Sequence, residues 1–244
     1  MSPSSLLLVA GVGLISGVVN TLAGAGSLVT LPALVMLGVP ANVANATNRV
    51  GVVLQSGAAT LTFDRKGLLD RRVSLKLMAP TGLGALLGAL ASAVLDPAVF
   101  ERVVAFVMLL VLAITLWPGA LARLRWPAGW SSAPLFAAVG FYGGFLQAGV
   151  GLFLLAALGA AEGLDIIRGN AVKSALVAGF SLVSLLVFGA FGLIDWPLAA
   201  ALSVGSTTGG WLGSHLAVAG GERLIKVVLT VTVLASSAHL WGLF

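Results

Sequence analysis

The sequence predicts an all-α polytopic membrane protein with two four-segment repeats, inverted relative to each other, in which the first segment of each half is broken or re-entrant. Hydrophobic residues make up 59% of its 244 residues and charged residues only 9%, against roughly 25% charged residues in a soluble domain. The few charges are clustered, and they leave seven long uncharged runs: 1–48, 77–95, 103–122, 126–161, 174–194, 196–221 and 227–244.

Eight apolar segments follow from this pattern, because a helix that crosses the hydrocarbon core needs about 20 apolar residues. They run over about 5–38, 46–63, 73–95, 98–117, 133–161, 171–194, 196–219 and 223–244. They lack the alternation of barrel strands, and a helix satisfies its own backbone polar groups in lipid, so each segment is predicted to be helical. The N-terminal segment has no basic region typical of a signal peptide and is expected to stay attached.

Residues of the second half repeat those of the first at a nearly constant offset. The matched pairs are Gly17 and Gly144, Asn20 and Gln147, Gly24 and Gly151, Asn45 and Asn170, Asp70 and Asp195, and, after a small deletion, Glu101 and Glu222. Internal symmetry of this kind is common in secondary transporters. We therefore expect a first transmembrane repeat over 1–122, a cytoplasmic linker over 123–132 and a second transmembrane repeat over 133–244.

The first segment of each half is too long for one straight transmembrane helix. As a helix it would extend about 50 Å in the first half and about 43 Å in the second, against a hydrocarbon core of about 30 Å. Each contains paired glycines near its middle, Gly24 with Gly26 and Gly149 with Gly151. Glycine readily adopts the backbone conformations of a helix break, so both segments are predicted to be broken.

The distribution of Lys and Arg indicates the orientation, because these residues concentrate in cytoplasmic loops. The loop over 64–76 holds five of them and is predicted to be cytoplasmic. If segment 133–161 turns back, eleven of the thirteen basic residues lie on the cytoplasmic side, whereas a crossing would leave seven there. The re-entrant arrangement is therefore preferred, with both termini outside the cytoplasm.

Small and polar residues gather at the two predicted breaks. They are Asn20, Thr21, Gly24, Gly26 and Ser27 at the first break, and Gln147 and Gly151 at the second. Single small residues often serve only helix packing in membranes. A whole cluster inside an overlong segment favours a broken element that lines a substrate site, so these residues are candidate substrate-binding residues.

Two further polar stretches precede the segments predicted to begin near residues 46 and 171. They contain Asn45, Asn48 and Arg49 in the first half, and Asn170 and Lys173 in the second. Asn often caps a helix start, and a cation in the first helical turn opposes the helix dipole. A bound anion would remove that conflict, which makes these five residues candidate substrate-binding residues. The alternative is that Arg49 and Lys173 reach the lipid head groups.

Other functional classes find no support in the sequence. It has no cysteine, no His, Asp and Glu cluster suited to a metal, no Ser-His-Asp set and no GxxxxGK[ST] phosphate loop. We therefore expect no enzyme activity, no metal and no cofactor.

The net charge of +5 comes with no continuous basic stripe, so no nucleic-acid partner is expected. His215 is expected at a polar interface near a helix end, with a proton-carrying role as the alternative.

The motifs at the breaks resemble those of the sulfite exporter TauE/SafE family, also called the toluene-sulfonate uptake permease family. The matching residues are Gly17, Asn20, Gly24, Gly26, Ser27, Leu31, Pro32, Leu34, Gly38, Pro40 and the run 44–48, then Gly151, Gly163, the run 168–171 and Lys173. The resemblance covers nearly the whole chain. It implies a multi-pass protein of a prokaryotic inner membrane that exports or takes up sulfite, sulfonates or other small organosulfur anions.

The combined expectation is a secondary transporter for a small anion, sulfite or an organosulfonate-type sulfur anion, that works by alternating access of its two repeats. Its partners are then this anion and the lipid bilayer, with H⁺ or Na⁺ as candidate coupling ions and a homo-oligomer as a candidate assembly. The alternative is a passive channel for a small solute, built on two re-entrant half-helices.

Overall fold

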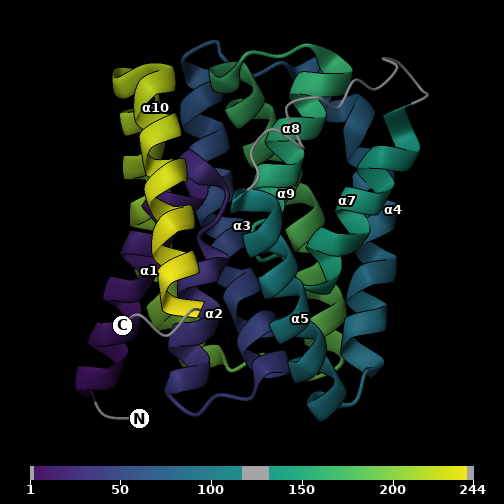
Figure 1. Ribbon diagram of the computed structural model, residues 1–244, viewed down its shortest axis with the longest axis vertical. Helices are drawn as coiled ribbons and strands as arrows, with labels where there is room; N and C mark the ends of the chain where they lie inside the picture. Colours follow the sequence, from purple (N-terminus) through teal and green to yellow (C-terminus); the bar gives the residue numbers. More distant parts are fainter. Residues whose placement is uncertain (1–2, 117–131, 241–244) are drawn as a thin grey trace.

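The computed structural model describes residues 3–116 and 132–240 (Figure 1). Within these ranges it has nine helices and no strand: α1 (Pro3–Ala23), α2 (Ser27–Met36), α3 (Ala41–Arg65), α4 (Arg71–Val94), α5 (Pro97–Leu116), α7 (Ala133–Phe145), α8 (Val150–Glu162), α9 (Ile166–Ala190) and α10 (Trp196–Leu240). The predicted all-α class is confirmed. The predicted linker lies outside the described residues, except for residue 132.

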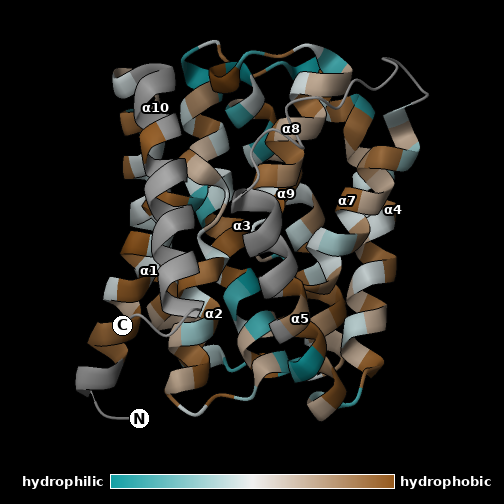
Figure 2. Ribbon diagram, viewed as in Figure 1, coloured by the Kyte–Doolittle hydropathy of each residue, from teal (hydrophilic) through white to brown (hydrophobic). Residues whose placement is uncertain are grey.

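The helices carry the surface of a membrane protein. Among the described residues, three helical stretches are long and apolar enough to cross a membrane: Leu6–Ala23, Arg71–Val94 and Ile166–Ala190. Large apolar side chains such as those of Leu7, Leu83 and Leu186 are exposed, and Figure 2 shows hydrophobic residues along the helices with many hydrophilic ones at the top of the view. Lipid, unlike water, makes such exposure favourable.

Both predicted helix breaks are confirmed. The first lies between α1 and α2, where Gly24 has a φ of 71°, and the second between α7 and α8, where Gln147 has a φ of 67° and Gly149 a φ of 70°. These angles are in the left-handed region, which is easy for glycine and uncommon for other residues. The positive φ of Gln147 therefore marks the second break as a place where the surrounding structure imposes the backbone conformation.

The pair α7 and α8 turns back on itself. The Ser132 hydroxyl, just before α7, donates to Glu162 Oε1 at the end of α8 over 3.3 Å. The start of α4 is at the same end, because Lys76 Nζ donates to both carboxylate oxygens of Glu162 at 2.8 and 3.0 Å. This is the fold-back that the charge distribution favours.

The pair α1 and α2 folds back in the same way, since Val9 of α1 packs with Leu31 and Leu34 of α2 in one cluster. In Figure 1 this pair lies toward the bottom of the view, near the N-terminus, and α8 lies toward the top. Hairpins that enter from opposite ends are what inverted repeats would produce, while the orientation of each half in the bilayer stays a prediction.

The Lys76–Glu162 ion pair should contribute measurably to stability. Both side chains are mostly buried, with exposed fractions of 26% and 9%, and Lys76→Met would leave the Glu162 carboxylate without its cation. We expect a loss of about 1–3 kcal/mol, read from thermal unfolding in detergent. The matched control is Arg71→Met, because Arg71 lowers the pKa of Asp64 through a pair that is solvent-exposed and should matter little. Equal shifts in the two variants would contradict this expectation.

Glycines bring helices of the two halves into close contact. Helix α1 packs on α10, and α7 packs on α4. A Cβ atom would overlap the partner helix backbone at the following glycines: Gly13 and Gly17 of α1, Gly205 and Gly209 of α10, Gly140 and Gly144 of α7, and Gly84 and Gly88 of α4. Small residues at such spacing let membrane helices approach closely. The first helix of each half is therefore held by a helix of the other half, through closely packed glycines.

Helices α3 and α9 each begin five residues earlier than the predicted segments. Pro40 stands just before α3 with a ψ of 140°, and the Asp165 carboxylate caps α9 by accepting from the amides of Ile167 and Arg168 at 2.9 Å. The prediction that Arg49 and Lys173 lie in a first helical turn is therefore wrong. Both residues lie further along their helices, where they face other elements.

The segments predicted over 196–219 and 223–244 belong to one helical element, α10, which has 45 residues. A straight helix of that length would extend about 68 Å. Figure 1 shows that the path of α10 instead reverses near the top of the view, so that its last part descends beside its first. The two predicted apolar segments therefore run in opposite directions within the residues of α10.

Candidate functional site

The two helix breaks touch each other in the interior of the protein. The amide of Gly151 donates to the carbonyl oxygen of Gly24 over 3.2 Å. A Cβ atom on either glycine would overlap the backbone of the other. Glycine is therefore required at both positions by the close approach, and at Gly24 also by its positive φ.

Arg49 of α3 reaches the end of α7 in the other half. Its Nη1 and Nη2 atoms donate to the carbonyl oxygens of Gly143 and Gly144 at 2.5 and 2.8 Å, and its guanidinium lies 5.5 Å from the centre of the Phe188 ring. The last carbonyls of a helix form the negative end of its dipole, so a cation is favourable there. The side chain is completely buried.

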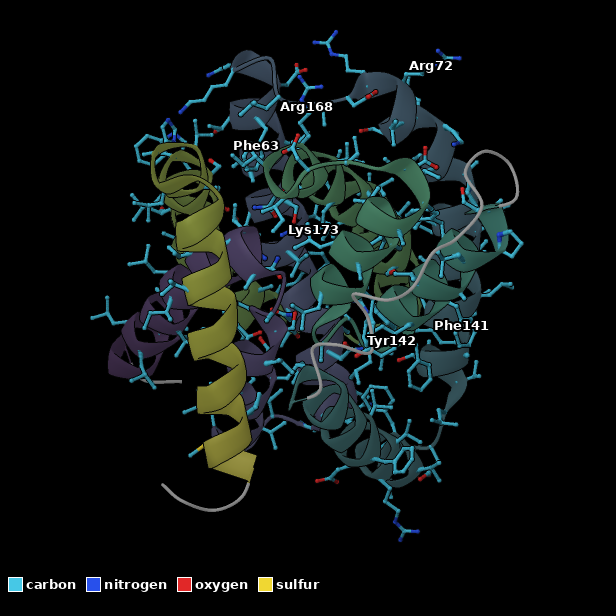
Figure 3. The ribbon with its side chains drawn as sticks, turned by 45° about the horizontal axis from the view of Figure 1, so that its top comes forward. Phe63, Arg72, Phe141, Tyr142, Arg168 and Lys173 are labelled. Carbon is cyan, nitrogen blue, oxygen red and sulfur yellow. The ribbon has the colours of Figure 1, made fainter. Side chains whose placement is uncertain are left out.

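Lys173 of α9 makes the corresponding contact with the end of α1. Its Nζ donates to the carbonyl oxygens of Asn20 and Thr21 at 3.1 and 3.0 Å. Figure 3 shows Lys173 inside the helical bundle, whereas Arg72 and Arg168 lie at one end of the molecule. Since Lys173 and Arg49 are both buried and bonded inside the protein, the alternative that they reach lipid head groups is wrong.

Amide side chains connect α3 to both breaks. Asn48 Nδ2 donates to the Ser27 hydroxyl at the start of α2 over 3.0 Å, and the Thr30 hydroxyl donates back to Asn48 Oδ1 over 3.0 Å. Asn45 Nδ2 donates to the carbonyl oxygen of Phe145 at the end of α7 over 2.9 Å. The polar face of α3 thus holds one broken segment from each half.

Several polar atoms around the breaks have no partner within the described residues. They are Arg49 Nε, Asn45 Oδ1, Gln147 Oε1 and both amide atoms of Asn170. Most buried polar groups in proteins are hydrogen-bonded, and each unpartnered one costs about 1–3 kcal/mol. Such a group of atoms beside two buried cations indicates a place where a polar ligand or water completes the bonding.

All twelve predicted site residues are buried, and they surround the crossed breaks rather than forming a separate surface. The N-cap residues of α2 and α8 are Gly26 and Gly149, which have no side chain to cap the helix, and Asn20 Oδ1 accepts from the Gly26 amide over 3.4 Å. These N-termini are the positive ends of two short helices and suit an anion. In the described part of the chain, no group of three His, Cys, Asp or Glu side chains could hold a metal ion.

Four residues take part in the site that the sequence does not predict as site residues. Ser181 accepts a hydrogen bond from Gln147 Nε2 over 3.2 Å, Thr30 bonds Asn48, and Gly143 and Gly144 offer their carbonyls to Arg49. Ser181 lies eleven residues after Asn170, three turns along the same face of α9. A search for polar residues at helical spacing would have found it, whereas nothing in the sequence marks the two glycine carbonyls.

Comparisons with known proteins agree with this architecture. A family model described as sulfite exporter TauE/SafE matches residues 9–240. The chain is 27% identical over 233 residues to a probable membrane transporter protein, ORF9, of Sinorhizobium sp, a match that covers 93% of this chain and 88% of the relative. It is 29% identical over 245 residues to the probable membrane transporter protein YfcA of Escherichia coli K12, a match that covers 98% of this chain and 91% of the relative. No solved structure shows significant similarity. The chain therefore belongs to the TauE/SafE family of membrane transporters.

Proposed function

We propose that this transporter moves a small sulfur anion, sulfite or an organosulfonate, across the inner membrane of a prokaryotic cell by alternating access of its two inverted repeats. One observation carries the proposal. Arg49 and Lys173 are buried at the crossing of the two breaks, and neither has a carboxylate partner in the described part of the chain.

A buried cation without a counter-charge is costly, because carbonyl dipoles compensate its charge only in part. An anion at the crossing would supply that charge. Its oxygens would accept from the unpartnered Arg49 Nε and from the Asn170 amide, and would face the starts of α2 and α8, where glycines occupy the N-cap positions. The site thus supports an anionic substrate, and the family supports the sulfur chemistry.

Alternating access is supported by the way each cation joins the two halves. Arg49 connects α3 to α7, and Lys173 connects α9 to α1. Rocking of one half against the other would loosen one connection and keep the other, while the contact of Gly24 with Gly151 stays at the centre. Such motion opens the crossing to one side of the membrane at a time.

Asn170→Leu tests the substrate site separately from the fold. Because neither amide atom of Asn170 has a partner in the described residues, an apolar side chain of similar size should leave thermal stability unchanged or raise it. Sulfite binding, measured by calorimetry on the purified protein, should weaken at least about tenfold, as expected for loss of a bond to a charged group. A panel of sulfate, thiosulfate, taurine, sulfoacetate and carboxylates would then identify the preferred anion.

The matched control is Asn42→Leu, since Asn42 Oδ1 is also buried and unpartnered but lies in the first turn of α3, two turns before Arg49. It should keep the affinity of the wild-type protein. Wild-type affinity in Asn170→Leu would contradict the proposed site.

Proteoliposomes distinguish the transporter from the passive channel. A transporter should accumulate labelled sulfite against its gradient when a H⁺ or Na⁺ gradient is imposed, and exchanging the two gradients identifies the coupling ion. Flux that runs only downhill and does not saturate would contradict alternating access and favour the channel.

A further inference from the structure

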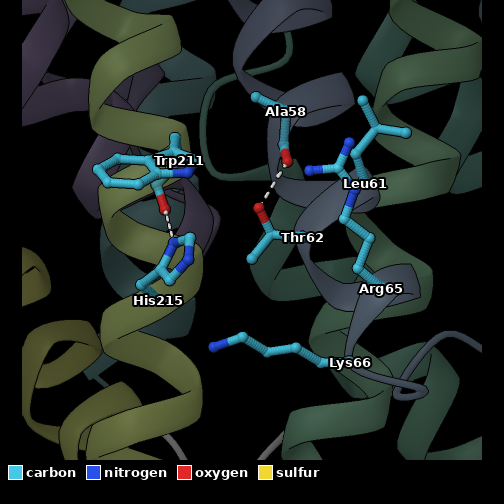
Figure 4. Close-up of a pocket in the computed structure, with 7 residues that line it drawn as sticks. All are labelled: Ala58, Leu61, Thr62, Arg65, Lys66, Trp211 and His215. Atoms are coloured by element: carbon cyan, nitrogen blue, oxygen red, sulfur yellow. Dashed lines mark hydrogen bonds between the residues drawn. The ribbon is translucent and has the colours of Figure 1, made fainter.

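A pocket lies between the end of α3 and α10. Its volume is about 300 Å³, which is at the lower end of the range for ligand sites. Figure 4 shows Arg65 and Lys66 on the α3 side, and Trp211 and His215 on the α10 side. Arg65 is sixteen residues beyond Arg49 on α3, about 24 Å along the helix, so the pocket does not include Arg49. Its α10 side is nearer to the first break, because Gly213, between Trp211 and His215, packs against Thr21 at the end of α1.

The pocket carries two uncompensated positive charges. Arg65 and Lys66 form no ion pair with any described residue, whereas the nearby Arg71 and Lys76 are paired with carboxylates. No acidic side chain lines the pocket, and Figure 4 shows the ammonium end of Lys66 directed toward the α10 side. An anion in the pocket would therefore meet two free cations.

The α10 side of the pocket is aromatic and polar. The rings of Trp211 and His215 lie with their centres 4.6 Å apart. His215 Nδ1 is 2.9 Å from the carbonyl oxygen of Trp211 and donates to it, so Nε2 of the neutral ring is an acceptor that suits a head-group hydroxyl, while the positive charge for the phosphate comes from Arg65 and Lys66. Tryptophan rings concentrate at the level of lipid head groups, where one side is apolar and the other is wet.

An apolar surface continues from the pocket toward the outside. Leu61, which lines the pocket, is 59% exposed. On the adjoining face of α10, Leu212 and Leu216 are also exposed. A ligand that fits this surface has a small anionic end for the cations and a long apolar part for the leucines. A soluble phosphate would contact only the cations and leave the leucines uncovered.

We propose that this pocket binds the phosphate head group of an anionic membrane lipid, with the acyl chains lying along Leu61 and the exposed leucines of α10. The pocket is at the end of the molecule that holds the loop over 64–76, which is predicted to be cytoplasmic. Basic pockets between transmembrane helices on that side suit acidic head groups.

The test uses the purified full chain in a neutral detergent and follows thermal unfolding during titration with dioctanoyl phosphatidylglycerol. The wild-type protein should show a saturable upward shift. Dioctanoyl phosphatidylcholine, which has no net charge, and glycerol 3-phosphate, which has no acyl chain, should produce none. A charge near the membrane surface changes affinity by about fivefold, so the double variant Arg65→Gln with Lys66→Gln should weaken phosphatidylglycerol binding by about 30-fold.

Arg72→Gln is the matched control, because Arg72 is an exposed cation six residues after Lys66 that does not line the pocket. It should bind phosphatidylglycerol like the wild-type protein. Native mass spectrometry of retained lipid gives a second readout that does not depend on stability. The proposal is overturned if the double variant keeps wild-type affinity, if Arg72→Gln loses as much, or if glycerol 3-phosphate or phosphatidylcholine binds equally well.

Discussion

Gly24→Ala should destabilise the protein by about 3 kcal/mol or more, because two costs combine at this position. The added Cβ would overlap the backbone of Gly151, so the two breaks could not touch. The φ of 71° at Gly24 is also unfavourable for alanine. The measurement is thermal unfolding of the purified protein in detergent, with the yield of monodisperse protein as a second readout.

Substitutions at two other glycines separate the cost of the backbone overlap from the cost of the positive φ. Gly38 has a φ of 82°, but a Cβ there meets nothing within 4 Å, so Gly38→Ala should cost only about 1–2 kcal/mol for its backbone conformation. Gly151 lies inside α8 without a positive φ, and Gly151→Ala should show the overlap alone. If Gly24→Ala were as mild as Gly38→Ala, the close contact of the two breaks would be refuted.

Arg49→Met and Lys173→Met should each abolish sulfite binding, a loss of at least about 100-fold, because each removes a buried positive charge from the proposed site. Both variants should also be less stable without ligand, since they leave the carbonyl ends of α7 or α1 without their donors. The decisive measurement is therefore the shift in unfolding temperature that sulfite causes in each variant relative to the same variant without ligand.

Lys76→Met controls for general destabilisation, because it also removes a largely buried cation, but at the end of the molecule. It should keep the sulfite-induced shift of the wild-type protein. Arg49→Lys retains the charge and loses the two-pronged contact with Gly143 and Gly144, and should bind with intermediate affinity. A wild-type ligand shift in both methionine variants would show that the cations serve only to cap helix ends.

The structure changes the physical reason for the importance of these cations. The sequence suggested a conflict between a cation and the N-terminus of its own helix. In the structure each cation instead stabilises the C-terminus of the helix that precedes the break in the other half. The partners are 94 and 95 residues away for Arg49 and more than 150 residues away for Lys173. Pairing at such separations depends on how the halves pack, which no local pattern encodes.

Helix starts were another place where local patterns were insufficient. The apolar run that predicts a segment near residue 171 begins after Asn170, whereas α9 begins at Ile166 behind its Asp165 cap. Asn170 and Lys173 are tolerated inside the helix because they face the protein interior rather than lipid. The hydropathy pattern therefore placed the start of α9 five residues too late and left Asn170, a candidate site residue, outside the helix.

What the sequence determined by itself is the class of the protein, the two broken segments and the residues that gather at them. These follow from local physics, because lipid demands long apolar helices and glycine pairs permit breaks. Only the tertiary structure decided that the breaks touch at Gly24 and Gly151 and that the cations cross between the halves. It also decided which amides, above all Asn170, are left without partners. Those features arise from close packing of distant helices, and small residues allow that packing without specifying which helices meet.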